Sequence, residues 1–383
     1  MNRPSPVSLA GLRFPVEQSR GRRYPELTHP YRNEFQRDRD RIVHTRAFRR
    51  LEDKTQVFTW SGSDHFRNRL THTIEVSQIA RTVAGVLDLD EDLTEALSLA
   101  HDIGHPPFAH AGEEELDRQM SRFGDRFEHN QHSLRILEQF EQRYARFPGL
   151  NLTFEVREGI AKHSRDFAPG EIPALEEYLP GQRPPLEAQL IDLADEIAYN
   201  TADLDDGLSA GFFTMEDIAA AVPEYAEIYE AVETQFAGAA DRLRFQETLR
   251  ALINLLVSGL IEGTYKAAIA SGVRTVEDVR NHLDRLAQMT EPAAVTNRAL
   301  KKFLRDRVYF SVPLSEERAR CAGMIADLFE FFLEHPDRMP EGYEDAPRPL
   351  HRAVCDYIAG MTDRYFARVH EEMIGPVTPR SGG

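Results

Sequence analysis

The feature that most constrains the fold is the helical period of the apolar residues, which continues through almost the whole chain. Between Val76 and Leu87, apolar side chains recur at spacings of three and four, as on one face of an amphipathic helix. The same period predicts further helices at about residues 93–103, 131–146, 155–164, 186–208, 215–235, 240–271, 275–288, 293–308, 314–335 and 350–373. Period-two alternation is nearly absent, and residues 54–60 are the best candidate for a strand or extended segment. We therefore predict an all-α fold.

The 383 residues are predicted to form one main domain with additions at both ends. Residues 1–30 are expected to be a basic N-terminal arm, and residues 31–335 a core with its chemistry within 60–210. Residues 336–374 are expected to be a C-terminal helical extension, and residues 375–383 a disordered tail.

The charge of the chain is unevenly distributed. The formal net charge of −17 argues against general nucleic-acid binding as the main role. Residues 1–50 nevertheless contain 12 arginines and no lysine against five acidic residues. Arginine's planar fork matches phosphate oxygens, so this segment suggests phosphate recognition. A flexible arm or a subunit contact is an equally good interpretation for Arg20, Arg22 and Arg23.

Composition also indicates the cellular compartment of the protein. The chain has two cysteines, Cys321 and Cys355, which fit neither a disulfide scaffold nor a thiolate metal site. No apolar run approaches the roughly 20 residues that span a bilayer, and the N-terminus lacks the apolar stretch of a secretory signal. We expect a cytoplasmic protein that does not enter a membrane.

A histidine-rich stretch predicts a divalent-metal site. Seven of the 14 histidines lie between residues 65 and 132. His101 and Asp102 are adjacent at the end of an apolar helical pattern, where both can reach one cation. His72 lies on the apolar face of the preceding helix. Asp195 interrupts an apolar helical stretch, where an unpaired carboxylate is costly to bury. These four residues are the proposed metal ligands.

A polar ladder extends from Asp195 along the same helix. Tyr199 and Asp203 follow at i+4 and i+8, so the three side chains share one face. An aromatic ring followed by a carboxylate suits a sugar ring and its hydroxyl. A solvated acidic helix end is the alternative interpretation for the neighbouring Asp205 and Asp206.

Other residues near the metal-capable stretch suit phosphate binding and proton transfer. Arg69 precedes His72 by one helical turn and can hold a phosphate that the metal also contacts. His110 and Glu113 would be one turn apart on a helix that begins after Pro107, as an oriented general acid/base pair. His129 and His132 either line the cleft or cap a helix.

Taken in order, these motifs resemble the HD-domain metal-dependent phosphohydrolases, which are named after the His-Asp pair. The match extends to the branch that resembles deoxyguanosine triphosphate triphosphohydrolase and covers about residues 19–370. Besides the four metal positions and Arg69, it rests on the blocks Phe35–His44, Ala47–Leu51, Lys54–Phe58, Phe127–Ser133, Ile197–Asn200 and Asp356–Asp363.

The resemblance implies an HD-domain helical fold and a reaction. Water would attack the α-phosphorus of a deoxynucleoside triphosphate (dNTP), dGTP or another, releasing deoxynucleoside and intact triphosphate and so controlling dNTP pools. His72, His101, Asp102 and Asp195 would hold one divalent metal. Mn2+ or Mg2+ is expected first, and Zn2+, Fe2+, Co2+ and Ni2+ are the alternatives.

The resemblance also implies roles for the other site residues. His110 and Glu113 would be the catalytic pair. The substrate would contact Gln56, Arg69, His105, His129, Tyr199 and Asp203. One departure is that many relatives carry a histidine just before the aspartate at position 203, whereas this chain reads Tyr199-Asn-Thr-Ala-Asp203. A polar contact near the substrate is lost there, so base preference could differ.

Members of this family often form hexamers and respond to deoxynucleotides at subunit interfaces. We therefore expect a homo-oligomer, hexameric or dimer-based, with an activating dNTP as a partner besides the substrate. Single-stranded nucleic acid is a further partner that the sequence leaves open without supporting it. The competing hypotheses are another HD-type enzyme, such as a nucleotidase or cyclic-nucleotide phosphodiesterase, and a nucleotide sensor with vestigial catalysis.

Overall fold

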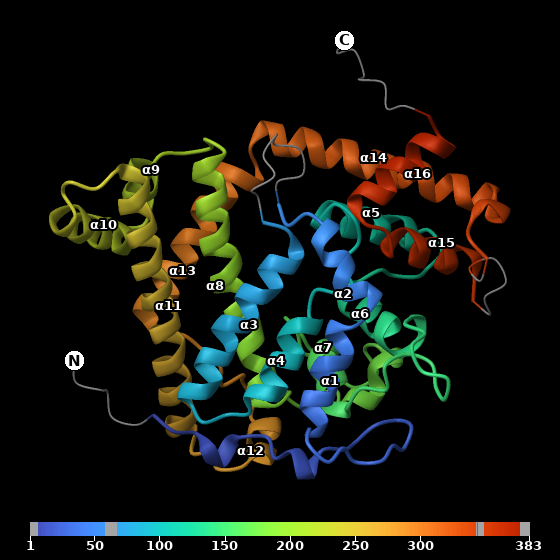
Figure 1. Ribbon diagram of the computed structural model, residues 1–383, viewed down its shortest axis with the longest axis horizontal. Helices are drawn as coiled ribbons and strands as arrows, with labels where there is room; N and C mark the ends of the chain where they lie inside the picture. Colours follow the sequence, from blue (N-terminus) through green and yellow to red (C-terminus); the bar gives the residue numbers. More distant parts are fainter. Residues whose placement is uncertain (1–6, 58–66, 342, 344–347, 376–383) are drawn as a thin grey trace.

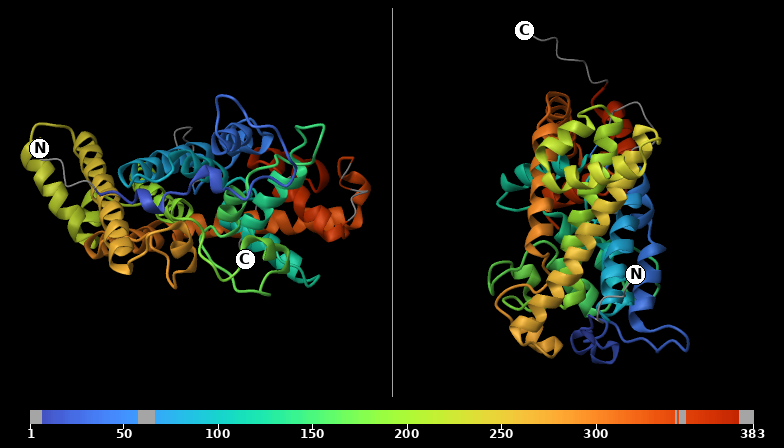
Figure 2. Two further views of the ribbon diagram at one scale, coloured as in Figure 1. Left: turned by 90° about the horizontal axis from the view of Figure 1, so that it is seen from below. Right: turned by 90° about the vertical axis from the view of Figure 1, so that its left-hand side faces the viewer.

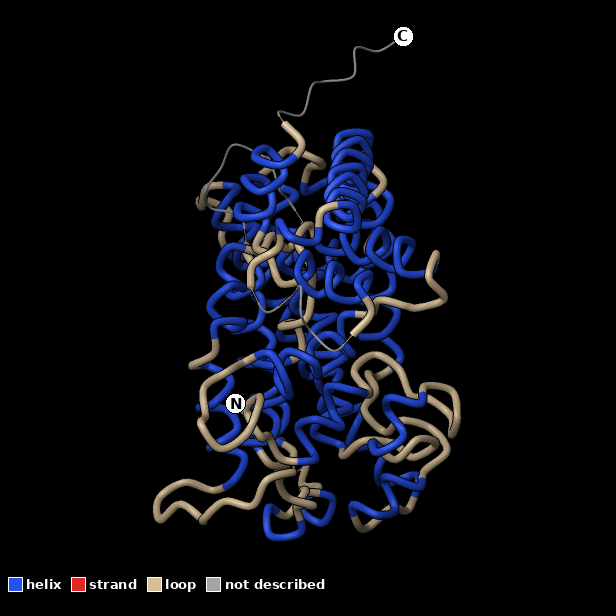
Figure 3. Tube along the Cα trace, turned by 90° about the vertical axis from the view of Figure 1, so that its right-hand side faces the viewer, coloured by secondary structure: helices blue, strands red, loops and turns tan. Residues whose placement is uncertain are grey.

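The structure is a computed structural model that describes residues 7–57, 67–341, 343 and 348–375. Helices and loops make up all of this described part, and Figure 3 shows no strand in it. The predicted all-α fold is confirmed. Within the extended candidate 54–60, Thr55 forms an isolated antiparallel bridge with Asn68, and residues 58–60 lie outside the described part.

Three helices form the centre of the molecule. α3 (Arg69–Val86) packs against both α4 (Glu91–Ala100) and α8 (Leu186–Ser209), and the three lie side by side in Figure 1. The side chains of Asn68 and Asp90 cap α3 and α4 by accepting hydrogen bonds from backbone N–H groups in their first turns. α8 is one continuous helix, as its apolar period predicted.

The N-terminal segment is packed more closely than a flexible arm would be. Leu9, Leu12 and Phe14 are buried in the main core. The guanidinium of Arg22 is 2.7 Å from Glu34 and 2.5 Å from the buried Asp38. Arg22 is therefore held inside the fold with its charge neutralised, and does not lie on a free arm.

Two helices in this region were not predicted. α1 (Glu34–Val43) packs on α4, and a capping box between Asn33 and Gln36 begins it. α2 (Arg46–Arg50) follows after Thr45, whose side chain accepts a hydrogen bond from the backbone of Phe48. Both helices are rich in charged residues, so their apolar stripes are too sparse for a clear period.

The segment after His101-Asp102 carries three short helices, α5 (Ala109–Ser121), α6 (His129–Arg135) and α7 (Phe154–Ala161). α6 continues as a π-helix over Ile136–Phe140, and the helix predicted to reach residue 146 ends there. Phe108 and Ala109, which precede and begin α5, adopt left-handed backbone conformations. This turn after the two prolines redirects the chain and starts a new helix, as the position of Pro107 suggested.

Several predicted helices are interrupted where local chemistry opposes them. The segment predicted at 215–235 is divided into two helices because Pro223 lacks the N–H needed to continue the first. The segment predicted at 275–288 is helical only to Asn281. The helices of this part of the chain are α9 (Met215–Ala221), α10 (Pro223–Gln235), α11 (Asp241–Ser271), α12 (Val276–Asn281) and α13 (Glu291–Leu304).

α11 is long and apolar enough to cross a membrane, judged by length and composition alone. In the structure it packs against α8, α10 and α13. Phe245, Leu249, Leu252, Leu256 and Leu260 are buried and share one face of the helix. This one-sided burial is the pattern of a helix that packs on a protein core.

The C-terminal helices form a second hydrophobic cluster at the opposite end of the molecule from α9 and α10 (Figures 1 and 2). α14 (Val312–Glu334), α15 (Leu350–Ala359) and α16 (Asp363–Met373) enclose it together with α5. The single helix predicted at 350–373 is broken at residues 360–362, where the side chain of Thr362 caps α16. The domain boundaries stay predictions, although α14 packs with the helices that follow it.

Candidate metal centre and active site

The four proposed metal ligands converge where α3, α4 and α8 meet. His72 Nε2 lies 2.8 Å from Asp195 Oδ1 and 3.9 Å from Asp102 Oδ2. His101 Nε2 lies 3.6 Å from Asp102 Oδ1 and 3.8 Å from Asp195 Oδ1. His72, His101 and Asp102 are buried. Residues 123 positions apart in the sequence therefore present ligand atoms to one small volume.

The donor set fits a divalent cation. His101 Nδ1 lies 2.6 Å from the backbone oxygen of Ser98, which orients the ring and leaves Nε2 directed at the carboxylates. That buried Nε2 has no hydrogen-bond partner among the described atoms. Imidazole nitrogens beside carboxylate oxygens suit Mn2+, Fe2+ or Zn2+.

Electrostatics favour a positive charge at this point. Burial by itself lowers the pKa of His101, but Asp102 and Asp195 outweigh it and raise that pKa to about 9. Burial opposes ionisation of Asp195, yet His101 and His72 hold its pKa well below the usual range. Two ionised carboxylates therefore face two imidazoles, an arrangement that either a proton or a metal cation can stabilise.

A second polar cluster lies beside the metal-capable one and consists of His105, Glu113 and His129. His105 Nδ1 is 2.9 Å from Asp102 Oδ1, and the rings of His105 and His129 stack with centroids 3.9 Å apart. Glu113 Oε1 lies 2.7 Å from His129 Nδ1 and accepts a hydrogen bond from the His129 backbone. The two clusters are thus joined through Asp102 and His105.

His110 is placed differently from the other predicted site residues. Its side chain is 81% exposed, and its Nδ1 lies 3.9 Å from Glu113 Oε2, beyond hydrogen-bond range. In this structure the imidazole paired with Glu113 is that of His129. The catalytic role predicted for His110 and Glu113 stays a prediction.

Arg69 and Lys54 are buried basic groups at the same site. Arg69 lies 2.6 Å from Asp102 Oδ2, so this proposed phosphate ligand is ion-paired in the structure. Lys54 Nζ donates to the backbone oxygen of His105, and burial lowers the pKa of Lys54 well below its usual value. Gln56 is half-buried in the segment that runs beside the start of α3, and its Oε1 lacks a hydrogen-bond partner among the described atoms.

The predicted row of Asp195, Tyr199 and Asp203 lies on α8, and Tyr309 is an additional partner of Asp203. Tyr199 is half-buried, and the Nζ of Lys301 lies 5.8 Å from its ring centroid. Asp203 is buried and accepts a hydrogen bond from the hydroxyl of Tyr309. Burial raises the pKa of Asp203 to about 7, so it is an acceptor or a donor near neutral pH.

The sequence interpretation missed a histidine–aspartate pair behind the metal-capable cluster. His163 Nδ1 lies 2.7 Å from Asp192 Oδ1, and its ring centroid is 5.2 Å from that of His101. Ligand atoms of His101, His163 and Asp195 all lie within 4.8 Å of one another. The i, i+3 spacing of Asp192 and Asp195 was a signal, but nothing in the sequence indicated that His163 would meet them.

An all-helical fold with His72, His101-Asp102 and Asp195 at its centre defines a member of the HD-domain phosphohydrolases. The HD domain matches residues 69–200, and a phosphohydrolase-associated domain matches residues 287–372. HD domains are metal-dependent, and the buried group His72, His101 and Asp102 of this hydrolase could hold a metal ion.

Relatives similar over nearly the full length refine the assignment. A deoxyguanosinetriphosphate triphosphohydrolase-like protein of Azoarcus sp. is 47% identical over 96% of this chain and 97% of the relative. Proteins of the same description from Ralstonia nicotianae (97% of this chain, 96% of the relative) and Geobacter sulfurreducens (95% and 96%) are each 46% identical. The chain belongs to the deoxyguanosinetriphosphate triphosphohydrolase-like family.

Proposed function

We propose that this protein hydrolyses dNTPs, dGTP among them, to deoxynucleoside and inorganic triphosphate, and thereby controls dNTP pools. The observation that carries the proposal is the continuity of the two clusters, because Asp102 lies 3.6 Å from His101 and 2.9 Å from His105. A phosphate held at the metal position would thus lie beside proton-transfer groups. The descriptions of the relatives support this substrate class.

Each group has a distinct part in the proposed reaction. His72, His101, Asp102 and Asp195 would hold Mn2+ or Mg2+, which supplies the positive charge that stabilises the developing charge on phosphate. Arg69, which now pairs with Asp102, can donate its remaining N–H groups to phosphate oxygens. Glu113 fixes the imidazole of His129 through the 2.7 Å contact. Burial, Arg69 and His129 lower the pKa of His105, which stays neutral.

The sugar contacts are proposed for the α8 ladder and Gln56. Tyr199 presents an aromatic surface, and Asp203 and the unpaired Oε1 of Gln56 offer acceptors to a 3′-hydroxyl. A ring packed beneath C2′ leaves no room for a ribose hydroxyl. Other HD-type phosphohydrolases have no evident need for this set of residues.

A product assay tests the reaction. We expect each active dNTP, incubated with Mn2+, to yield deoxynucleoside and intact triphosphate, which ion-exchange chromatography separates from shorter phosphates. Orthophosphate or pyrophosphate as the sole inorganic product would contradict the proposal and favour another HD-type activity. Asp102→Asn, which removes one ligand charge, is the matched inactive control.

Assembly, activation and compartment are further parts of the proposal. We propose a homo-oligomer, hexameric or dimer-based, that an additional dNTP activates in the cytoplasm. Two buried, unpaired cysteines suit a reducing compartment. Assays with single dNTPs and with mixtures, together with the mass of the particle by light scattering, test these points. Full activity of a monomer with each dNTP alone would reject assembly and activation together.

A further inference from the structure

A cavity of about 530 Å3 lies between α2, the segment from α6 through the π-helix, and α15. Its volume is within the range of small-molecule sites in proteins. The polar residues that matter in its lining are Arg46, Arg50, His132, Glu141, Arg143 and Asp356. The π-helix Ile136–Phe140 lines it too, and such segments recur at functional sites.

Two buried side chains in this lining have polar atoms without a hydrogen-bond partner among the described atoms. His132 is 2% exposed, and neither of its ring nitrogens has a hydrogen-bond partner among the described atoms. Asp356 is 1% exposed, and its Oδ1, also unpartnered, lies 3.6 Å from His132 Nδ1. Buried polar groups are normally satisfied, so unpartnered groups that line a cavity indicate a bound ligand.

The lining is rich in guanidinium groups that carboxylates do not balance. Arg50 donates to the backbone oxygen of Gly360 at 2.5 Å, its Nε is unpaired, and no carboxylate of the described residues forms an ion pair with it. Burial lowers the pKa of Arg50. Arg46 likewise forms no ion pair within the described part of the chain, and Arg143 donates to the backbone oxygen of His44.

Asp356 does not neutralise the arginines of the lining, because it already interacts with two other arginines. Its Oδ2 accepts a hydrogen bond from Arg135 and lies 3.5 Å from Arg348 Nε. Glu141 Oε1 accepts a hydrogen bond from the backbone of Ala47. The lining therefore has three arginines and two carboxylates, and one of these carboxylates also interacts with two further arginines, in a chain whose formal net charge is −17.

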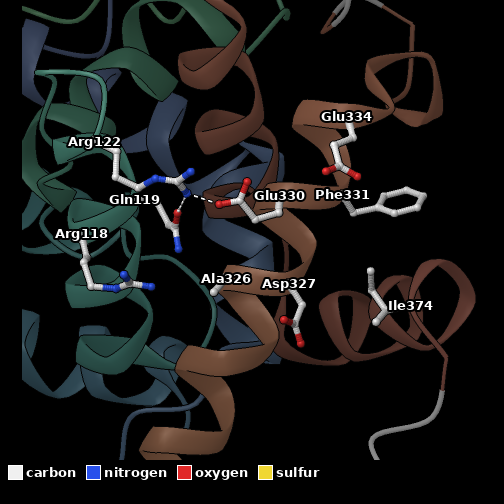
Figure 4. A pocket seen from close by; sticks show the side chains of 9 residues that line it. All are labelled: Arg118, Gln119, Arg122, Ala326, Asp327, Glu330, Phe331, Glu334 and Ile374. Atoms are coloured by element: carbon white, nitrogen blue, oxygen red, sulfur yellow. Dashed lines mark hydrogen bonds and ion pairs between the residues drawn. The ribbon is translucent and has the colours of Figure 1, made fainter.

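A groove lined by other residues provides a contrast. It lies between α5 and α14, and arginines also line it (Figure 4). There, each guanidinium has its own carboxylate, since Arg118 pairs with Glu115 and Arg122 with Glu330. The groove thus has no surplus of positive charge, whereas the cavity does.

We propose that the cavity lined by Arg46, Arg50, Arg143 and His132 is a binding site for a phosphate-bearing anion. The planar fork of arginine donates two parallel hydrogen bonds to phosphate oxygens, and unpaired guanidinium N–H groups supply them. His132 adds a donor at the buried end. The site is separate from the candidate active site, although α6 connects them, with His129 one turn before His132.

Calorimetry on the full chain in EDTA tests this proposal. The probes are inorganic tripolyphosphate, orthophosphate and deoxyadenosine monophosphate, which separate an inorganic source from a nucleotide source. In the double variant Arg46→Gln/Arg143→Gln, binding of at least one probe should weaken by about tenfold or more, because two charge-assisted contacts are lost. Arg50→Lys, which keeps the charge and loses the fork, should give an intermediate loss.

Arg118→Gln/Arg122→Gln is the matched control, with two exposed arginines removed from the groove of Figure 4. Wild type and both double variants keep the same candidate active site, so phosphate binding there contributes equally to all three. The difference in affinity between the two double variants therefore measures binding in the cavity. A loss confined to tripolyphosphate and orthophosphate indicates an inorganic ligand, and a loss confined to the nucleotide indicates a nucleotide ligand. Equal affinities of both double variants for all three probes would overturn the proposal.

Discussion

Glu187, in the first turn of α8, is a fully buried carboxyl group whose protonation is coupled to folding. Its Oε1 accepts hydrogen bonds from the backbones of Phe14 and Asp90, and its Oε2 has no partner among the described atoms. Burial raises the pKa of Glu187 from 4.5 to about 7. Because the folded-state value is the higher one, its contribution to stability is complete below pH 4.5 and is lost as the pH rises to about 7.

We expect Glu187→Gln to flatten the pH dependence of stability. The difference in unfolding free energy between variant and wild type should change by about 3 kcal/mol between pH 4.5 and 8, in favour of the variant at high pH. Urea unfolding at several pH values measures this difference. The exposed Glu291→Gln should show no such trend, and a wild-type-like pH profile for Glu187→Gln would disprove the assignment.

The pair of His163 and Asp192 gives a second prediction at the residue scale. Asp192 holds the imidazole at 2.7 Å and is itself paired with Arg285. We expect His163→Ala to weaken Mn2+ binding by about 10- to 100-fold and Asp192→Asn to weaken it less, as for groups that orient metal ligands. Electron paramagnetic resonance of free Mn2+ measures the affinity. Unchanged affinity in both variants would mean that His163 serves packing alone.

At the scale of elements, Gly104 sets how closely the end of α4 approaches α6. Its N–H donates to Ser133 Oγ at 2.8 Å, and a Cβ at this position would overlap the backbone oxygen of His129 and the backbone nitrogen of Ser133. The φ of Gly104 is not positive, so an L-residue could adopt its backbone conformation. The glycine is required for the close approach alone. It thereby holds His105 and His129 in stacking contact.

Gly104→Ala should separate α4 from α6. We expect a loss of about 1–3 kcal/mol in unfolding free energy, typical of overpacking a buried contact, together with a fall in hydrolysis. Thermal unfolding and the product assay measure the two effects. In contrast, Gly323→Ala on α14 meets nothing within 4 Å and should leave stability equal or raised. Equal behaviour of the two variants would refute the close-approach argument.

The period of the apolar residues predicted the positions of most helices well, but it predicted their ends less well. α8 and α11 agree with predictions 186–208 and 240–271 to within a few residues, because each has a long apolar face. The missed break at 360–362 depends on Thr362 capping α16 and on a backbone contact from Arg50. The contact from Arg50 comes from a distant residue, so the local pattern does not contain it, whereas the cap from Thr362 is a local signal that the apolar period does not register.

At the scale of the whole molecule, the candidate metal ligands connect three helices. His72 comes from α3, His101 and Asp102 from the end of α4, and Asp195 from α8. A cation bound by the folded chain stabilises it by about 2.7 kcal/mol at a concentration 100 times the dissociation constant. We therefore expect EDTA to lower the melting temperature and added Mn2+ to restore it.

Asp102→Asn is the control for this stabilisation. The variant should melt at the same temperature with EDTA and with Mn2+, because its ligand set has lost a charge. Scanning calorimetry of both proteins under both conditions gives the comparison. A full Mn2+ response in the variant would place the metal elsewhere.

The sequence by itself determined the features that depend on short separations along the chain. Apolar period predicted the all-α class, and helical spacing aligned Asp195, Tyr199 and Asp203 on α8. The adjacency of His101 and Asp102 indicated the metal chemistry. The motif order then indicated the family, which the comparisons confirmed.

Tertiary structure decided which distant side chains meet. Glu113 pairs with His129 instead of the nearby His110, Asp203 with Tyr309, and Asp192 with His163. The arginine-rich cavity likewise combines residues from α2, α6 and α15. The physical reason is that helical period fixes only the face on which a residue lies. The packing of one helix against another decides what that face contacts.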